Sequence, residues 1–110
     1  MDQSVDSIRG QAGRLAALVD YQTGAVVSRT LIDKSAGTVT LFAFDRGQGL
    51  SEHTAPFDAL VFIYEGAAEV TISGEGRRVI GGEVILMPAR QPHSLRALEP
   101  FKMMLVMIRQ

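Results

Sequence analysis

Most of this chain alternates between apolar and polar residues in short stretches that closely spaced turns separate. In the stretch Glu69 to Ser73, Val70 and Ile72 alternate with polar neighbours, so one side of an extended strand is apolar. Glycine-rich turns follow, as at residues 74–76. Many short strands at this spacing are typical of an all-β sandwich or barrel. The expected strands are residues 26–32, 38–44, 51–54, 60–65, 68–73, 78–80, 83–87, 93–97 and 102–108.

A different pattern precedes the strands and indicates two parts, an N-terminal segment at residues 1–23 and a barrel at residues 24–110. Ser7 can cap a short helix, and two glycines weaken that prediction. The apolar residues of this helix recur at three- and four-residue spacing, at Ile8, Ala12, Leu15 and Val19. We expect this helix to lie outside the barrel as a lid or an interface element.

Composition limits the partners and the compartment. At 110 residues and 46% hydrophobic content, the chain is long enough for one core. Its 11 Lys and Arg residues balance 12 Asp and Glu residues without a basic run, which argues against nucleic acid as a partner.

The absence of cysteine excludes disulfides and thiolate metal sites. No signal peptide and no apolar run near the ~20 residues of a membrane span is present, so we expect a cytoplasmic protein without a membrane partner.

Two of the expected strands are apolar on both faces. They are residues 39–44 and 103–108. A barrel of this size buries only one face of such strands, and the other face would leave a larger exposed apolar patch than soluble monomers usually have. The sequence therefore predicts a homodimer in which a second subunit covers this patch.

The two histidines of the chain, His53 and His93, each lie in a stretch punctuated by glycine and proline. The first stretch resembles the first motif of the cupin superfamily, and the second resembles the second motif. The matching positions are Gly47, His53, Gly66, Gly82, Pro88 and His93, whereas Arg90 replaces a motif glycine and Ala97 a motif asparagine. A closer similarity, at residues 51–59 and 100–103, is to short single-domain bacterial cupins of unassigned function. The resemblance implies a double-stranded β-helix, or jelly-roll barrel.

The resemblance also implies an incomplete metal site. The cupin ligands are two histidines and a glutamate of the first motif and the histidine of the second, but here Ala55 and Ala59 replace two of them. His53 and His93 remain, with Asp58 as a candidate third ligand, although strand alternation points it away unless a bulge intervenes. Three readings stay open: a divalent Zn, Ni, Fe or Mn ion at low occupancy, metal-free acid–base use, or histidines that bind no ion.

Alternation places residues 53, 55 and 57 on one side of their strand, and the resemblance implies that this side is the barrel interior and that His93 points into the same cavity. We therefore predict a ligand pocket lined by His53, Ala55, Ala59, Met87 and His93. Four methionines form either a soft lining for an apolar ligand or ordinary core, namely Met87, Met103, Met104 and Met107. Arg90 and Arg96 flank His93 and either bind an anionic group or are solvated.

The sequence thus favours a small cupin barrel that binds an unidentified small molecule, without identifying catalytic residues. The alternative is a mononuclear metal-dependent enzyme of dioxygenase or isomerase type that acts on a small organic acid, phenolic or sugar.

Overall fold

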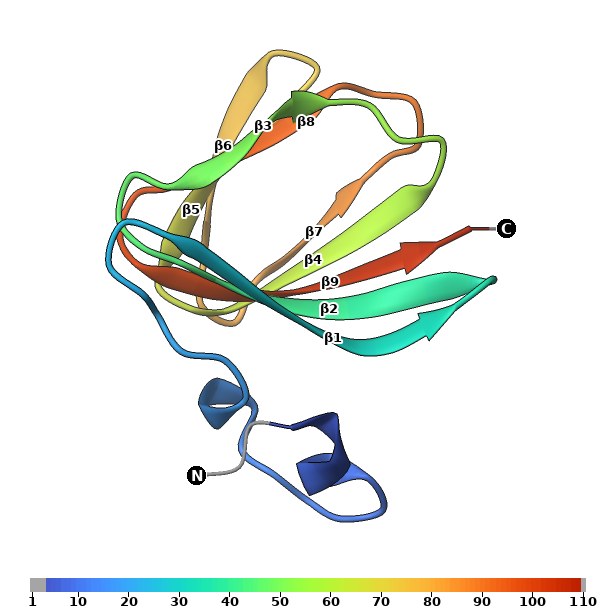
Figure 1. Ribbon diagram of the computed structural model, residues 1–110. Helices are drawn as coiled ribbons and strands as arrows, with labels where there is room; N and C mark the ends of the chain where they lie inside the picture. The colour runs from blue at the N-terminus through green and yellow to red at the C-terminus, as the bar shows by residue number, and fades with distance from the viewer. Residues whose placement is uncertain (1–3, 110) are drawn as a thin grey trace.

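A computed structural model describes residues 4–109 and shows two antiparallel sheets that face each other (Figure 1). One sheet has the strand order β1-β2-β9-β4-β7 and the other β3-β8-β5-β6. The strands are β1 Val26–Lys34, β2 Gly37–Phe44, β3 Gly49–His53, β4 Asp58–Glu65, β5 Ala67–Ile72, β6 Glu75–Ile80, β7 Val84–Met87, β8 His93–Ala97 and β9 Phe101–Ile108. Each predicted strand is present, and the prediction of an all-β jelly-roll barrel is confirmed.

The alternation of the sequence decides which side chains enter the barrel. In β4, Ala59, Val61 and Ile63 are buried, whereas Asp58 and Leu60, which alternate with them, are exposed. In β5, Val70 is fully buried and Ile72 packs against the same core. Successive side chains of a strand point to opposite faces, so each strand contributes every second residue to the interior.

Aromatic side chains close one end of the barrel. Phe44, the last residue of β2, stacks on Phe101, the first of β9, with ring centroids 4.4 Å apart, and both are fully buried. Gly66 joins β4 to β5 beside this stack at a φ of +81°, and a Cβ there would come within 2.0 Å of the Pro100 carbonyl oxygen. This motif glycine is therefore required both by its backbone conformation and by the close approach of residues 100–101.

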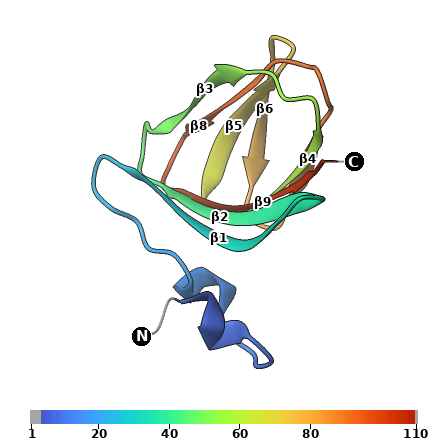
Figure 2. The same ribbon diagram turned by 45° about the vertical axis from the view of Figure 1, so that its right-hand side comes forward.

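The N-terminal segment lies against the outer face of the five-stranded sheet, below β1 and β2 in Figure 2. The prediction of one helix from Ser7 to Val19 is wrong in detail, because the segment forms two short 3-10 helices, Val5–Ile8 and Leu15–Ala17. Gly10 adopts a φ of +74° between them, which ends the first helix. No helix among residues 4–109 has the length and apolar character of a membrane span.

Buried contacts attach this segment to the sheet. Leu18 and Val19 pack on Leu41 and Ala43 of β2. The buried Lys102 of β9 donates from Nζ to the Ala16 carbonyl oxygen at 2.7 Å. The protein's own N-terminal segment therefore covers part of the outer apolar face, which sequence reasoning had assigned to a second subunit alone.

Candidate functional site

The two histidines meet at the end of the barrel opposite the aromatic stack. His53 is the last residue of β3 and His93 is the first of β8, and the antiparallel register pairs them directly. Their Nε2 atoms lie 3.0 Å apart, and the rings meet edge to face with centroids at 4.3 Å. The two motif halves, 40 residues apart in the sequence, thus form one polar site.

Backbone carbonyl oxygens hold the other nitrogen of each ring. Nδ1 of His53 lies 2.9 Å from the Ser51 carbonyl oxygen, and Nδ1 of His93 lies 3.2 Å from that of Gln91. His53 is exposed, whereas His93 is buried. Burial lowers the pKa of His93, the Gln91 carbonyl opposes this effect, and the neighbouring His53 lowers the pKa further. The main influence on His93 is therefore burial, which favours the neutral imidazole.

A cavity of about 30 Å³ adjoins the pair. Its lining includes every residue predicted for the ligand pocket, His53, Ala55, Ala59, Met87 and His93, together with Leu50, Leu95, Met103, Leu105 and Met107. That these residues bind a ligand stays a prediction. The cavity is small in this conformation compared with the ≈ 300–1,000 Å³ of typical ligand pockets.

Strand β9 supplies three lining residues that were absent from the predicted pocket. Met103, Leu105 and Met107 alternate inward, and their spacing of two is the signal that identifies them. Met104 belongs to the opposite face and packs with Leu41 in the outer cluster, so for this methionine the alternative of ordinary core applies. The periodicity of two shows that every second residue of β9 points inward. Only the packed barrel shows which of the two alternating sets of residues faces the cavity.

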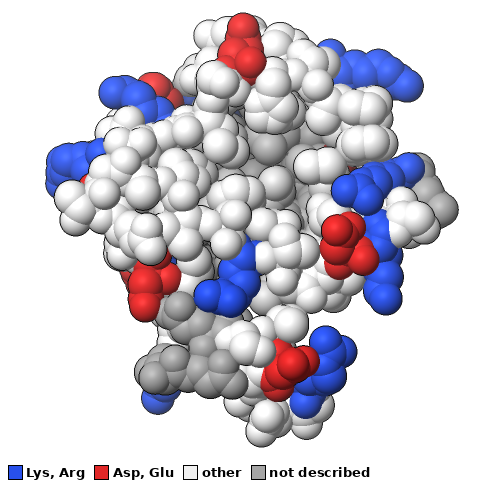
Figure 3. Space-filling view, in the orientation of Figure 1, with Lys and Arg blue, Asp and Glu red and all other residues white. Residues whose placement is uncertain are grey.

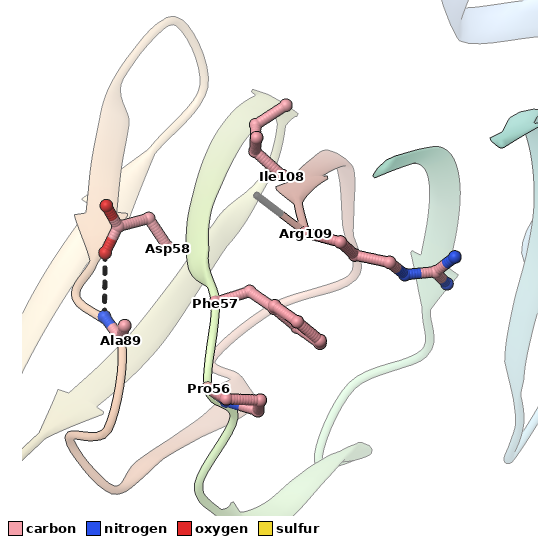
Figure 4. A pocket seen from close by; sticks show the side chains of 6 residues that line it. All are labelled: Pro56, Phe57, Asp58, Ala89, Ile108 and Arg109. Atoms are coloured by element: carbon pink, nitrogen blue, oxygen red, sulfur yellow. Dashed lines mark hydrogen bonds between the residues drawn. The ribbon is translucent and has the colours of Figure 1, made fainter. Parts of the chain in front are cut away.

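The structure places Asp58 away from the histidines. Its Oδ1 accepts a hydrogen bond of 2.8 Å from the Ala89 backbone N–H, in an open groove that Phe57 and Arg109 also line (Figure 4). Strand β3 ends at His53, so the alternation does not continue to Phe57, and the prediction that Phe57 points inward is wrong.

These positions decide whether the four-ligand metal site of cupins fits this chain. Methyl groups line the cavity at Ala55 and Ala59, and Asp58 is bonded elsewhere. Within residues 4–109, no group of three or more His, Cys, Asp or Glu side chains is arranged to hold a metal ion. The residues present therefore do not fit that site.

The loops around the histidine end contain strained backbone. In the described part of the chain, Ser73 and Arg90 are the non-glycine residues with positive φ, at +50° and +67°. The Arg90 N–H donates to the Ala55 carbonyl oxygen at 2.7 Å, and the Ser73 N–H donates to that of Pro92 at 2.8 Å. Arg90 thus occupies a left-handed conformation at the position where the cupin motif has glycine. Such strain concentrates at functional sites.

Charged side chains lie around the periphery of the molecule in Figure 3, and a hollow in the middle of this view is lined by uncharged residues. Arg96, which was considered for anion binding, pairs instead with Glu69 at 3.4 Å on an exposed surface. On the face seen in Figure 3, blue and red side chains are interspersed and neither sign forms a continuous patch.

Comparisons with known proteins agree with this geometry. The family model described as an AraC-like ligand-binding domain matches residues 35–109. A conserved protein of unknown function from Streptococcus pyogenes has 38% identity and a TM-score of 0.89, over 93% of this chain and 90% of that one. A cupin 2 conserved barrel domain protein from Leptotrichia buccalis has 36% identity and a TM-score of 0.84, over 86% of this chain and 46% of that one. The chain belongs to the AraC-like ligand-binding domains of the cupin superfamily.

The cupin barrel is also seen in a more distant structure. A cupin superfamily protein from Desulfitobacterium hafniense has a TM-score of 0.88 over 93% of this chain and 94% of that one, at 24% identity, which shows the shared fold alone. No curated protein sequence matches this cupin. The predicted superfamily is thus confirmed.

Proposed function

We propose that this cupin barrel binds a small organic molecule at the cavity beside His53 and His93. The observation that carries the proposal is the composition of the lining, in which two imidazoles face otherwise apolar side chains. Small-molecule sites combine such an apolar wall with a few convergent polar groups that orient the ligand. The ligand is therefore a largely apolar molecule with one acidic or hydrogen-bonding group, which the imidazoles contact. Membership of a ligand-binding family supports this function.

The size of the cavity limits the ligand. Ligand pockets are typically ≈ 300–1,000 Å³, so a cavity of about 30 Å³ must open on binding. Met87, Met103 and Met107 have unbranched, flexible side chains that can change rotamer to make space. His53 lies at the end of its strand and is exposed, so its ring can move toward solvent when its contacts with His93 and the Ser51 carbonyl are broken. We therefore expect a compact ligand, such as a small aliphatic or aromatic carboxylic acid or a phenol.

A ligand panel tests this function. Metal-free protein is titrated with small carboxylic acids, phenols and sugars, and thermal unfolding is measured together with the NMR signals of the imidazoles. We expect an acid or phenol to raise Tm and shift the signals of both histidines. Ala55→Leu, which places a larger side chain in the lining of the cavity, should abolish the effect, and Thr54→Leu at the exposed neighbour should preserve it. If the ligand still bound to Ala55→Leu, the proposal that it binds in this cavity would be contradicted.

The metal-dependent enzyme considered from the sequence is not proposed here, because the donor set of the family's metal site is incomplete. A stable site needs about three or four protein ligands. Only His53 and His93 of that set face the cavity.

We also propose that this cupin is a homodimer through the outer face of the five-stranded sheet. Leu60 of β4 lies between Val106 of β9 and Leu86 of β7 in the register, and these outward residues continue a row across the sheet. The large exposed apolar side chains near this row are Ile32, Leu60, Val84, Leu86 and Ile108. A second copy presents the same row, and two sheets can pack face to face with their rows in contact. The net charge of −1 adds little repulsion between copies.

Sedimentation at micromolar protein tests the dimer. We expect the wild type to sediment as a dimer and the double variant Leu60→Glu/Leu86→Glu to sediment as a monomer with an unchanged circular dichroism spectrum. Ile80→Glu, at an exposed apolar position on the other sheet, is the matched control and should remain dimeric. A wild type that stays monomeric across this range would refute the proposal.

A further inference from the structure

The hydrogen bonds of the two histidines leave room for one cation between their facing nitrogens. A carbonyl oxygen only accepts, so the contacts of Nδ1 with Ser51 and Gln91 require the proton of each neutral ring to be on Nδ1. Both Nε2 atoms then present lone pairs to each other at 3.0 Å. If one ring changes tautomer, its Nδ1 lone pair faces a carbonyl oxygen instead. A cation between the Nε2 atoms satisfies both rings at once, whether it is a proton shared in the hydrogen bond of 3.0 Å or a metal ion that replaces this proton.

Sulfur donors share the same cavity. Met87, Met103 and Met107 line it together with the two imidazoles. Met87 and Met103 are almost completely buried, so these sulfurs have little contact with water. Thioether sulfur is a soft donor that favours Cu(I), and imidazole also suits copper. Zn and other borderline or hard ions gain little from thioether, so the cavity differs in chemistry from the nitrogen and oxygen site of the cupin motif.

We propose that His53 and His93, together with thioether sulfur from the methionines of this cavity, form a binding site for a single Cu(I) ion. In this proposal, alanine at positions 55 and 59 removes two ligands of the family's nitrogen and oxygen site, and thioether sulfur takes their place. The cavity would then bind Cu(I) instead of losing all affinity for metal. The set combines two nitrogen donors with up to three sulfur donors.

The spacing of the two imidazole nitrogens is close to that of two ligands on one ion. Two nitrogens at about 2.0–2.1 Å from a tetrahedral ion lie roughly 3.3 Å apart. The observed separation of 3.0 Å must therefore widen by a few tenths of an ångström, and the exposed His53 is free of close packing on one side.

This inference goes beyond the proposed function, although it uses the same histidines. A small organic ligand and Cu(I) would compete for His53 and His93. The ligand titration described above is carried out on metal-free protein, and the copper titration is carried out without ligand, so either proposal can fail alone.

Anaerobic competition with a chromogenic Cu(I) chelator tests the site. We expect wild-type protein to withdraw one equivalent of Cu(I) from the chelator. In the triple variant Met87→Leu/Met103→Leu/Met107→Leu, the affinity for Cu(I) should fall roughly a hundredfold while the affinity for Zn(II) changes little, because only Cu(I) gains from the sulfurs. Leucine conserves the volume of methionine, and thermal unfolding verifies that the variant is folded.

Met104→Leu is the matched control, because Met104 lies next to Met103 in β9 and packs on the opposite face of the sheet. Its affinity for Cu(I) should equal that of the wild type. X-ray absorption should detect sulfur bound to copper in the wild type and in Met104→Leu, and only nitrogen or oxygen in the triple variant. Failure of the wild type to withdraw Cu(I), or undiminished affinity in the triple variant, would overturn the proposal.

Discussion

The two ends of the barrel are made from the same strands and differ in what fills them. At one end, Phe44 and Phe101 are stacked and fully buried. At the other end, His53 and His93 face a small cavity with flexible methionines around it. Strand β9 passes through both, from Phe101 in the aromatic end to Met107 in the histidine end.

The difference shows that stability and function are separated along the barrel axis. Large, stiff rings fill one end without a void, and such packing contributes strongly to stability. The histidine end has small side chains at Ala55 and Ala59, adaptable methionines, and the two strained non-glycine residues of the described chain. We therefore expect substitutions at the aromatic end to affect folding and those at the histidine end to affect binding.

The largest expected effect on stability is at the aromatic end. Phe101→Ala should lower the free energy of unfolding by about 3–5 kcal/mol, because it removes a buried ring and leaves a cavity. Met107→Leu at the histidine end should cost less than ~1.5 kcal/mol, because the volume is conserved. Urea denaturation measures both. If the two variants lost similar amounts of unfolding free energy, the separation of stability and function between the two ends would be contradicted.

Restoring the two missing ligands should change metal affinity strongly. Ala55→His/Ala59→Glu adds two donors beside His53 and His93 and should raise the affinity for Zn(II) or Ni(II) by roughly a hundredfold or more. Calorimetric titration measures the affinity. The metal-free variant should be less stable, because a cavity of about 30 Å³ does not accommodate both larger side chains.

Ala55→His/Ala59→Gln, which lacks the carboxylate, is the control for that experiment and should show a smaller gain. Equal Zn(II) affinity in the wild type and the restored variant would mean that residues 55 and 59 do not reach a common ion.

A moderate effect is expected from relieving backbone strain at the histidine end. Arg90→Gly should raise the free energy of unfolding by about 1 kcal/mol, because glycine adopts a φ of +67° without steric cost. The converse substitution Gly82→Ala, at a φ of +94° with open space around the new Cβ, should lower it by about the same amount. Thermal or urea unfolding measures both. A loss of stability in Arg90→Gly would show that the arginine side chain makes contacts that outweigh the strain.

The smallest expected effect is on the pH dependence of stability, and it comes from the carboxylate of Asp45 near the aromatic end. The backbone N–H groups of Gly24 and Arg46 lower the pKa of Asp45. Since the folded-state pKa lies below the unfolded value of about 3.9, Asp45 stabilises the protein above that pH, and its contribution is lost as the pH falls through the folded pKa. Wild type and Asp45→Asn should differ in urea midpoint at pH 7 and converge in strong acid. If the difference in urea midpoint between wild type and Asp45→Asn did not change with pH, the ionised carboxylate of Asp45 would not be the source of the stabilisation.

The sequence by itself determined the strands, the turns and the superfamily. The alternation in Glu69 to Ser73 and the glycines at 66 and 82 are local signals, because side-chain period and positive φ depend on the residues in place. The two histidines and the two alanines could likewise be assigned to one cavity from their motif positions. The spacing of apolar residues predicted a helix from Ser7 to Val19, but Gly10, one of the two glycines that weakened this prediction, adopts a positive φ and interrupts the helix.

Only the tertiary structure decided the contacts between distant residues. The register between β3 and β8 places Nε2 of His53 3.0 Å from Nε2 of His93. The end of β3 at His53 turns Phe57 and Asp58 into a separate groove, and the phase of β9 sends Met103 and Met107 inward and Met104 outward. A one-residue change of phase would reverse each of these assignments, and the phase is fixed by the packing of the whole barrel instead of by any single strand.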